Sequence, residues 1–361
     1  MIYLDHAATT PICEAAKKAI VEHLDDFGNP SSSHELGHKA LMLIEDARER
    51  IAKCINAEPD EIYFISGGSE ANTWALNYGH SFASKLEHHS IVANQFYDTI
   101  DNFGKVIVND LEKRVRSYYS LDMISCMAVN NEIGTIQPIK NLAQMAHHNG
   151  LLFHTDAVQA VGHIPIDVKD INCDMLSASG HKFGSPKGIG FLYVKNGVDL
   201  FPFINGGKQE RGLRGGTENV LGIIAMAAAL EDAVEHMQER YEHIYKLKSK
   251  LLHRLLFMKG IYLNGSYEDR VASNINIRID GVKGEDVVSM CDQYGICISA
   301  GSACNEGNAE PSHVLKAIGL TDEQALSSIR ITLGHENTMD EIYYVCEMLP
   351  KIIKRLREIN A

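Results

Sequence analysis

The sequence lacks the features that mark several classes of protein. Its 361 residues contain 34 lysines and arginines against 47 aspartates and glutamates, a formal net charge of −13, so a basic surface for direct nucleic-acid binding is not expected. No apolar run approaches the length that spans a membrane. The first residues have neither the charged nor the apolar region of a secretory signal. We therefore expect a cytoplasmic protein that binds neither membranes nor nucleic acid.

The spacing of the cysteines also gives no sign of metal ligation or disulfide pairing. The 8 cysteines are dispersed and form no Cys-x-x-Cys pair, which argues against a structural zinc site, and in a large cytoplasmic chain disulfides are not expected. Most of them should be small buried hydrophobic residues. They are Cys13, Cys54, Cys126, Cys173, Cys291, Cys297, Cys304 and Cys346.

Strand and helix patterns alternate through the first half of the chain, with no internal repeat or long linker. The alternation predicts an α/β fold with a mostly parallel sheet covered by helices. The predicted strands are 61–65, 106–108, 122–129, 151–155, 175–178 and 189–194.

The pattern changes after a long predicted helix at 219–257. Short strands are predicted at 274–278, 296–299 and 329–332, with helices between them, which is typical of a smaller α+β domain.

One lysine stands at the exit of a predicted strand. Lys182 lies in Ser179-Gly-His181-Lys182, ahead of a glycine-rich turn, and ligands bind at strand exits in open α/β sheets. A lysine there can form a Schiff base with a carbonyl cofactor, although a solvated loop lysine is the commoner case. Another strand ends on Asp156, and a carboxylate beside a pyridinium nitrogen makes pyridoxal phosphate an electron sink. Asp156 could equally be a helix N-cap.

Together, Asp156, Gln159 and the Ser-x-His181-Lys182 run resemble the NifS/IscS-like cysteine desulfurases. These enzymes form part of the class V aminotransferase branch of the pyridoxal-phosphate enzymes. The resemblance implies the aspartate-aminotransferase-like fold (fold type I) and pyridoxal 5'-phosphate as cofactor. It also implies a large cofactor domain at 12–250 and a small domain made of 1–11 and 251–361.

A candidate phosphate site lies in a Ser-Gly-Gly-Ser turn that contains Gly68 and Ser69. The turn follows a strand and opens a helix, and backbone N–H groups at a helix N-terminus bind phosphate. Alone, it is only a turn signal. The resemblance adds Ser179 and His181 as phosphate ligands, and Thr217 as a ligand supplied by the partner subunit of a homodimer.

Three further residues are assigned to the cofactor ring by the resemblance. His88, in Glu-His-His, would stack on the ring and move protons, a task that suits a group titrating near neutral pH. Asn131 would contact the ring near the substrate, and Gln159 its phenolic oxygen. Alone, His88 could be an ordinary histidine and Asn131 part of an Asx-rich turn.

A reactive cysteine is predicted in Gly301-Ser-Ala-Cys304. Small residues around one thiol make an accessible loop. The resemblance implies that Cys304 attacks the substrate sulfur and carries it as a persulfide. Arg330 presents a guanidinium fork that fits a carboxylate, and it would bind the α-carboxylate of the substrate with help from Asn29. A surface ion pair is the ordinary alternative for this arginine.

The resulting hypothesis is an L-cysteine desulfurase with catalytic Lys182, Cys304 and His88 and no metal. It would give L-alanine and pass sulfur to an acceptor protein for iron–sulfur cluster, thio-cofactor or thiolated tRNA synthesis. One rival hypothesis is a selenocysteine lyase or another class V lyase on the same scaffold. The other is a non-enzymatic sulfur or iron–sulfur assembly scaffold that uses the cysteines. Three departures from the family pattern bear on docking and substrate affinity: the stretch 70–130 is short, Asn72-Thr73 replaces a more usual Asp/Asn-Asn pair, and His335 stands where arginine is usual.

Overall fold

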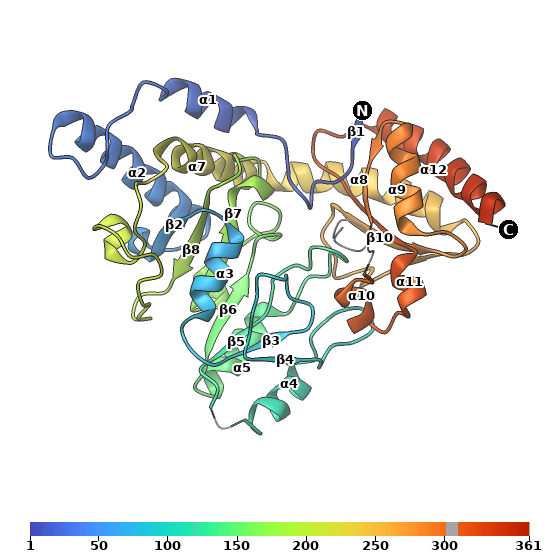
Figure 1. Cartoon of the computed structure of the whole chain (residues 1–361), viewed down its shortest axis with the longest axis horizontal. Coiled ribbons are helices and arrows are strands. Elements are labelled where there is room, and N and C mark those ends of the chain that lie inside the picture. Colours follow the sequence, from blue (N-terminus) through green and yellow to red (C-terminus); the bar gives the residue numbers. More distant parts are fainter. Residues whose placement is uncertain (119, 301–309, 361) are drawn as a thin grey trace.

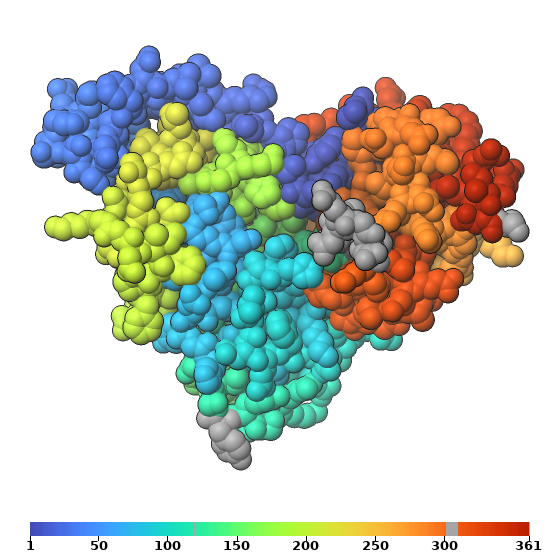
Figure 2. All heavy atoms as spheres, viewed as in Figure 1, coloured from blue at the N-terminus to red at the C-terminus, as the bar shows by residue number. Residues whose placement is uncertain are grey.

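The computed structural model of the chain describes residues 1–118, 120–300 and 310–360. It has a large and a small lobe, and the dark blue start of the chain lies where the two lobes meet (Figure 2). Among the described residues, no helix is long and apolar enough to cross a bilayer.

The large lobe is built on a seven-stranded sheet of described residues (Figure 1). β8 runs antiparallel to both of its neighbours, and the strand pairs from β7 to β4 are parallel, which confirms the predicted α/β class. In order across the sheet, the strands are β2 (Ile62–Ile65), β8 (Gly190–Val194), β7 (Met175–Ser179), β6 (Leu152–Asp156), β5 (Met123–Ser125), β3 (Ser81–Ser84) and β4 (Gln95–Tyr97).

Helices cover the two faces of this sheet because its strands alternate apolar side chains between them. In β8, Phe191 faces the main core with α2 and α7, whereas Leu192 faces the second core with Trp74 of α3. The helices of this lobe are α1 (Glu14–Glu22), α2 (Glu35–Cys54), α3 (Gly68–Leu76), α4 (Val108–Val115), α5 (Ile139–His148), α6 (Val168–Ile171) and α7 (Val220–Glu235).

The small lobe packs helices on an antiparallel sheet with the order β12-β13-β10-β9. Its strands are β9 (Ile261–Leu263), β10 (Asn274–Ile279), β12 (Ser299–Ala300) and β13 (Ser328–Thr332). Its helices are α8 (Met237–Leu256), α9 (Gly284–Gln293), α10 (His313–Ala317), α11 (Asp322–Leu326) and α12 (Met339–Asn360).

The start of the chain belongs to the small lobe by its pairing. β1 (Ile2–Tyr3) lies parallel to β11 (Ile296–Cys297), and Leu4 is buried in the core of this lobe. The segment then crosses to the large lobe, where Thr10 N donates to His181 O. This crossing places residues 5–10 beside the lysine turn.

Several predicted elements differ in the structure. Of the strand predicted at 122–129 only Met123–Ser125 forms, and the strand predicted at 296–299 is divided between β11 and β12. The strand predicted at 106–108 is wrong: Val106 makes only an isolated bridge with Ile100, and Val108 begins α4, whose Leu111 and Val115 face the core at helical spacing. The long helix predicted at 219–257 is two helices that meet at His236, because α7 packs in the core of the large lobe and α8 in that of the small lobe.

The short stretch noted in the sequence has a structural counterpart. β3 and β4 are parallel neighbours, yet residues 85–94 join them without a helix. Parallel strands are usually joined by a crossover of a dozen or more residues that contains a helix. The short crossover leaves apolar side chains uncovered, with Val92 exposed by 82% and Phe96 by 42%.

Candidate active site

A cavity of about 270 Å³ opens at the carboxyl ends of β6 and β7, next to the start of α3. This is the edge where parallel strands of an open sheet offer side chains to a ligand. The structure brings most of the predicted site residues to this cavity: Gly68, Ser69, His88, Asn131, Asp156, Gln159, Ser179, His181, Lys182 and Arg330.

Lys182 ends a short 3-10 turn that directly follows β7. Its Nζ donates hydrogen bonds of 2.8 Å to both Ala7 O and Ala8 O, so the N-terminal segment holds the amine in place. Burial, with a further contribution from the charge of Arg330, lowers the pKa of the Lys182 ammonium to about 8. Roughly a tenth of the amine is therefore neutral near pH 7, and the neutral amine is the nucleophilic form.

Asp156, the last residue of β6, is buried at the bottom of the cavity with 4% exposure. Its Oδ1 accepts a 2.9 Å hydrogen bond from Val158 N, and its Oδ2 accepts one of 2.7 Å from Asn72 Nδ2. Burial raises the pKa of this carboxyl group, while these hydrogen bonds and the charges of His88 and Lys182 favour the ionised form. A cation placed here would favour the ionised form further.

Asn72 was not predicted as a site residue. It projects from α3 and is 1% exposed, and its Oδ1 is a buried atom with no partner among the described residues. The sequence held only a weak signal, a departure from the usual family pattern at Asn72-Thr73. Buried polar atoms are normally hydrogen-bonded, so this one points to a missing ligand group.

The start of α3 makes the second end of the cavity. Gly68 is needed there because a Cβ would lie only 2.6 Å from Val158 Cγ2. Ser69 and Ser179 add hydroxyl groups beside the free N–H groups of the first helical turn. A helix N-terminus with two hydroxyl groups is a candidate site for a phosphate. His181 is held near by a 3.1 Å hydrogen bond between Nδ1 and Thr9 Oγ1, and burial lowers its pKa to about 4.

His88 enters the cavity from the β3–β4 connection. Its Nδ1 lies 2.8 Å from Ser90 Oγ, and burial lowers the pKa of the ring below its ordinary value. The preceding Glu87 is 3% exposed and accepts a 2.8 Å hydrogen bond from Met127 N. Burial, and then the charge of Asp156, raise the pKa of Glu87 to about 8. A neutral imidazole thus stands beside a protonated carboxyl group near pH 7.

Arg330 reaches the cavity from β13 of the small lobe. Its Nη2 donates to Asp5 Oδ1 at 2.9 Å and its Nη1 to Asn131 O at 3.1 Å. Its Nε is buried and has no acceptor among the described residues. Gln159 completes this wall, with Nε2 donating to Ala7 O at 2.9 Å. The guanidinium is therefore held at two of its nitrogen atoms, and the third has no acceptor among the described residues.

Two of the predicted residues are not brought to the cavity, and a third lies outside the described part of the chain. Asn29 is exposed and its Oδ1 accepts a hydrogen bond from Ser31 N. Thr217 is exposed on this single chain. Cys304 lies outside the described residues, which resume at Glu310. The roles of all three stay predictions.

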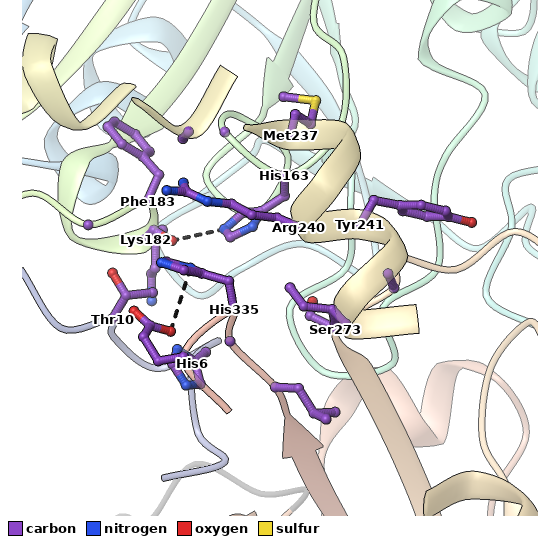
Figure 3. A pocket seen from close by; sticks show the side chains of 18 of the residues that line it. His6, Thr10, His163, Lys182, Phe183, Met237, Arg240, Tyr241, Ser273 and His335 are labelled. Carbon is purple, nitrogen blue, oxygen red and sulfur yellow. Dashed lines mark hydrogen bonds and ion pairs between the residues drawn. The ribbon is translucent and has the colours of Figure 1, made fainter. Parts of the chain in front are cut away.

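A smaller cavity, of about 60 Å³, lies behind Lys182 between the two lobes (Figure 3). His163 Nε2 stands 2.8 Å from the backbone Lys182 O, so the imidazole donates to the turn that carries the lysine. His335, noted as a departure in the sequence, lines this cavity next to Glu336 at 3.6 Å and does not line the cavity around Lys182 Nζ. Position 335, where the family usually has arginine, therefore lies outside the candidate site.

The family model for class V aminotransferases matches residues 2–345. The chain belongs to the class V aminotransferase family. The cysteine desulfurase IscS of Methanosarcina thermophila is 40% identical over 99% of this chain and 93% of its own length. That of Clostridium botulinum (strain Hall) is 42% identical, over 99% and 96%. The predicted place among the NifS/IscS-like cysteine desulfurases is thereby confirmed.

Solved structures give the same assignment within this family. A NifS-like protein from Rickettsia africae has a TM-score of 0.92 and 33% identity, over 98% of this chain and 99% of its own. A protein solved as SspA in complex with cysteine has a TM-score of 0.80 and 34% identity, over 94% and 100%. The predicted fold type I architecture is confirmed. Sequence alignments with IscS relatives extend over 380 to 386 positions, more than this chain of 361 residues, so those relatives carry insertions.

The class V family depends on pyridoxal phosphate, and the residues of the cavity fit that cofactor. A buried carboxylate, Asp156, stands where a pyridinium N–H can be met, and Lys182 offers an amine of lowered pKa. A helix N-terminus with Ser69 and Ser179 offers donors to a phosphate. The unpartnered Oδ1 of Asn72 adds a polar atom that awaits a donor.

Proposed function

We propose that this protein is a pyridoxal-phosphate-dependent L-cysteine desulfurase. It would convert L-cysteine to L-alanine and carry the sulfur as a persulfide on Cys304. The observation that carries the proposal is the convergence of Lys182, Asp156 and Arg330 on one cavity from both lobes of the fold. The curated IscS relatives, at about 40% identity over nearly the whole chain, support the choice of cysteine as substrate.

Each end of the cavity has its proposed task in holding the cofactor. Asp156 would accept a hydrogen bond from the ring nitrogen, and Asn72 keeps its carboxylate oriented through the 2.7 Å contact. Ser69 and Ser179, with the first N–H groups of α3, would bind the phosphate. When bound, pyridoxal phosphate supplies an electron sink for the bond-breaking at the amino acid.

Arg330 is the proposed anchor for the α-carboxylate of the substrate. Its Nε is buried and free among the described residues, and Nη2 is shared with Asp5. A carboxylate at the remaining N–H groups would add a second anion to the fork without first displacing Asp5, since a guanidinium carries five donors. Asn131, whose carbonyl fixes Nη1, lines the same wall.

Proton transfer falls to Lys182 and His88. The Lys182 amine, with its pKa of about 8, can take a proton from the substrate α-carbon and return one to the product. The carbonyl groups of Ala7 and Ala8 hold its position before the substrate arrives. Desolvation lowers the pKa of the His88 ring, so its neutral form can accept a proton in the same cavity.

Sulfur transfer is assigned to Cys304 on the sequence pattern. The thiolate forms a bond to the substrate Sγ while the substrate Cβ–Sγ bond breaks, and the electron pair stays with the three-carbon unit. That unit takes up a proton and leaves as alanine, so no external oxidant is needed. The persulfide then passes to a thiol of an acceptor protein that serves iron–sulfur cluster, thio-cofactor or tRNA thiolation. Thr217 would complete each cofactor site from the partner subunit of a homodimer.

The Cys304→Ser variant tests this function. It removes the nucleophile and little volume, so the protein should stay yellow while alanine formation from cysteine falls by orders of magnitude. Cys291→Ser and Cys297→Ser are matched controls that should keep the wild-type rate. Alanine is measured by chromatography and persulfide by thiol trapping.

Three outcomes would contradict the proposal. Near wild-type alanine formation by Cys304→Ser would remove the persulfide role. A far higher rate on selenocysteine than on cysteine would assign a selenocysteine lyase. A colourless protein that binds iron and forms no alanine would assign an assembly scaffold.

A further inference from the structure

A groove of about 560 Å³ lies between α8 and the edge strand β9 of the small lobe. It shares no lining residue with the cavity around Lys182. Its volume falls within the 300–1,000 Å³ that is typical of small-molecule sites. Figure 1 shows α8 as the long yellow helix that runs from the large lobe into the small one.

The groove contains a buried lysine without an acidic partner. Lys248 is 6% exposed, and its Nζ makes no hydrogen bond or ion pair with any described residue. Its closest recorded partner is the ring of Tyr245, whose centroid lies 5.2 Å away. Burial, and then the charge of Arg270, lower the pKa of Lys248 to about 8, so the ammonium form still predominates near pH 7.

The neighbouring Arg270 does not supply the missing charge. It is 5% exposed and donates to the carbonyl oxygens of Ser266 and Asn264 and to Asn274 Oδ1, all of them neutral. Two buried cations thus lie together in the described structure of a protein whose net charge is −13. Buried charges are normally paired, so this groove is complementary to an anion.

The walls of the groove are apolar and aromatic. Leu252 of α8 and Leu263 of β9 line it, together with Tyr245 and Tyr267, which expose 46% and 67% of their surface. Inorganic anions would leave these walls unused. Large rings exposed beside a concave surface are typical of sites that bind a flat apolar body.

We propose that this groove binds a small aromatic carboxylate, with the carboxylate beside Lys248 and the ring against Tyr245 and Tyr267. The site is independent of the proposed desulfurase reaction. It uses two features of the groove, a buried cation that has no acidic partner among the described residues and aromatic rings that are exposed beside it.

Calorimetric titration of the pyridoxal-phosphate-loaded protein with two matched probes tests the proposal. 2-Naphthoate and 2-naphthylmethanol share a ring system, and only the first carries a charge. We expect naphthoate to bind about tenfold or more tightly than the alcohol, as a charge-assisted contact implies. Lys248→Met should abolish that difference, whereas Lys246→Met, on the exposed side of α8, should preserve it. Tyr267→Ala should weaken both probes.

Carbon-13 NMR of the lysine side chains gives a readout apart from affinity. Naphthoate should raise the pKa of Lys248 above its value of about 8 in the free protein, because a neighbouring anion favours the ammonium form. Equal affinities of the two probes, unchanged naphthoate binding by Lys248→Met, or an unmoved Lys248 titration would each overturn the proposal. Tighter binding of a glutamate-rich peptide than of naphthoate would assign the groove to a protein partner and also overturn it.

Discussion

Glu87 should make the stability of this protein fall as the pH rises. In the folded protein its pKa is raised from 4.5 to about 8, chiefly by burial and then by the charge of Asp156. Between these values the folded chain keeps a proton that the unfolded chain has released, so folding becomes less favourable with rising pH. Three pH units, from pH 5 to pH 8, at about 1.4 kcal/mol each give a loss of about 4 kcal/mol.

The Glu87→Gln variant isolates this effect. Glutamine resembles the protonated side chain and keeps an acceptor for Met127 N. The free energy of unfolding of the variant should therefore not show the fall with rising pH that Glu87 causes. Urea unfolding of the cofactor-free protein at pH 5, 6, 7 and 8 should show the free energies of variant and wild type diverging by about 4 kcal/mol. Glu14→Gln, at an exposed carboxyl group, is the control and should follow the wild type.

Infrared spectroscopy checks the protonation itself. The wild type at pH 6 should show a carboxylic acid C=O band that Glu87→Gln removes and Glu14→Gln keeps. Unfolding curves of wild type and Glu87→Gln that stay parallel from pH 5 to pH 8, with no such band, would refute the reasoning. They would mean that Glu87 is ionised in the core although one of its carboxylate oxygens has no hydrogen-bond partner within residues 1–118, 120–300 and 310–360.

Three further predictions concern the cofactor site. Borohydride reduction and peptide mapping should place the pyridoxyl group on Lys182; a label on Lys187 would contradict the assignment. Asn72→Ala should weaken pyridoxal phosphate binding by roughly tenfold, because Asp156 loses the 2.7 Å hydrogen bond that orients it, and equal dissociation constants by fluorescence titration would count against this role. Mixed dimers of Lys182→Ala and Thr217→Val subunits should recover one intact site and part of the activity; a fully active monomer by light scattering would exclude shared sites.

The parts of the site that could be predicted are those with local signals. Asp156 and Lys182 each end or follow a buried strand, and the parallel order of β6 and β7 brings both ends to one edge of the sheet. Gly68 could be recognised only together with the other motifs, because a glycine-rich turn between a strand and a helix is by itself no more than a turn signal. The fold class followed from the same alternation of strands and helices.

The parts that could not be predicted depend on packing between distant segments. Asn72 reaches Asp156 across 84 positions of sequence, and nothing in its own neighbourhood marks it as a ligand of that carboxylate. The strand expected at 106–108 was wrong because Val106-Ile-Val is a β-branched run, which favours a strand locally. Leu111 and Val115 have helical spacing and are both buried in the core, which favours a helix over a strand in the folded protein.

The N-terminal segment explains why both charged groups of the site are in place before a substrate binds. Asp5 holds Arg330 of the small lobe at 2.9 Å, while Ala7 O and Ala8 O hold Lys182 of the large lobe at 2.8 Å. Asp5 and Arg330 are 325 positions apart in the sequence, and Ala7 and Lys182 are 175 positions apart. One short segment therefore couples the two lobes at the cavity. The charge of Arg330 also lowers the pKa of Lys182, and Asp5 opposes that shift. A substrate carboxylate bound to Arg330 would add negative charge near the amine, and would thereby raise its pKa just as a proton has to be accepted there.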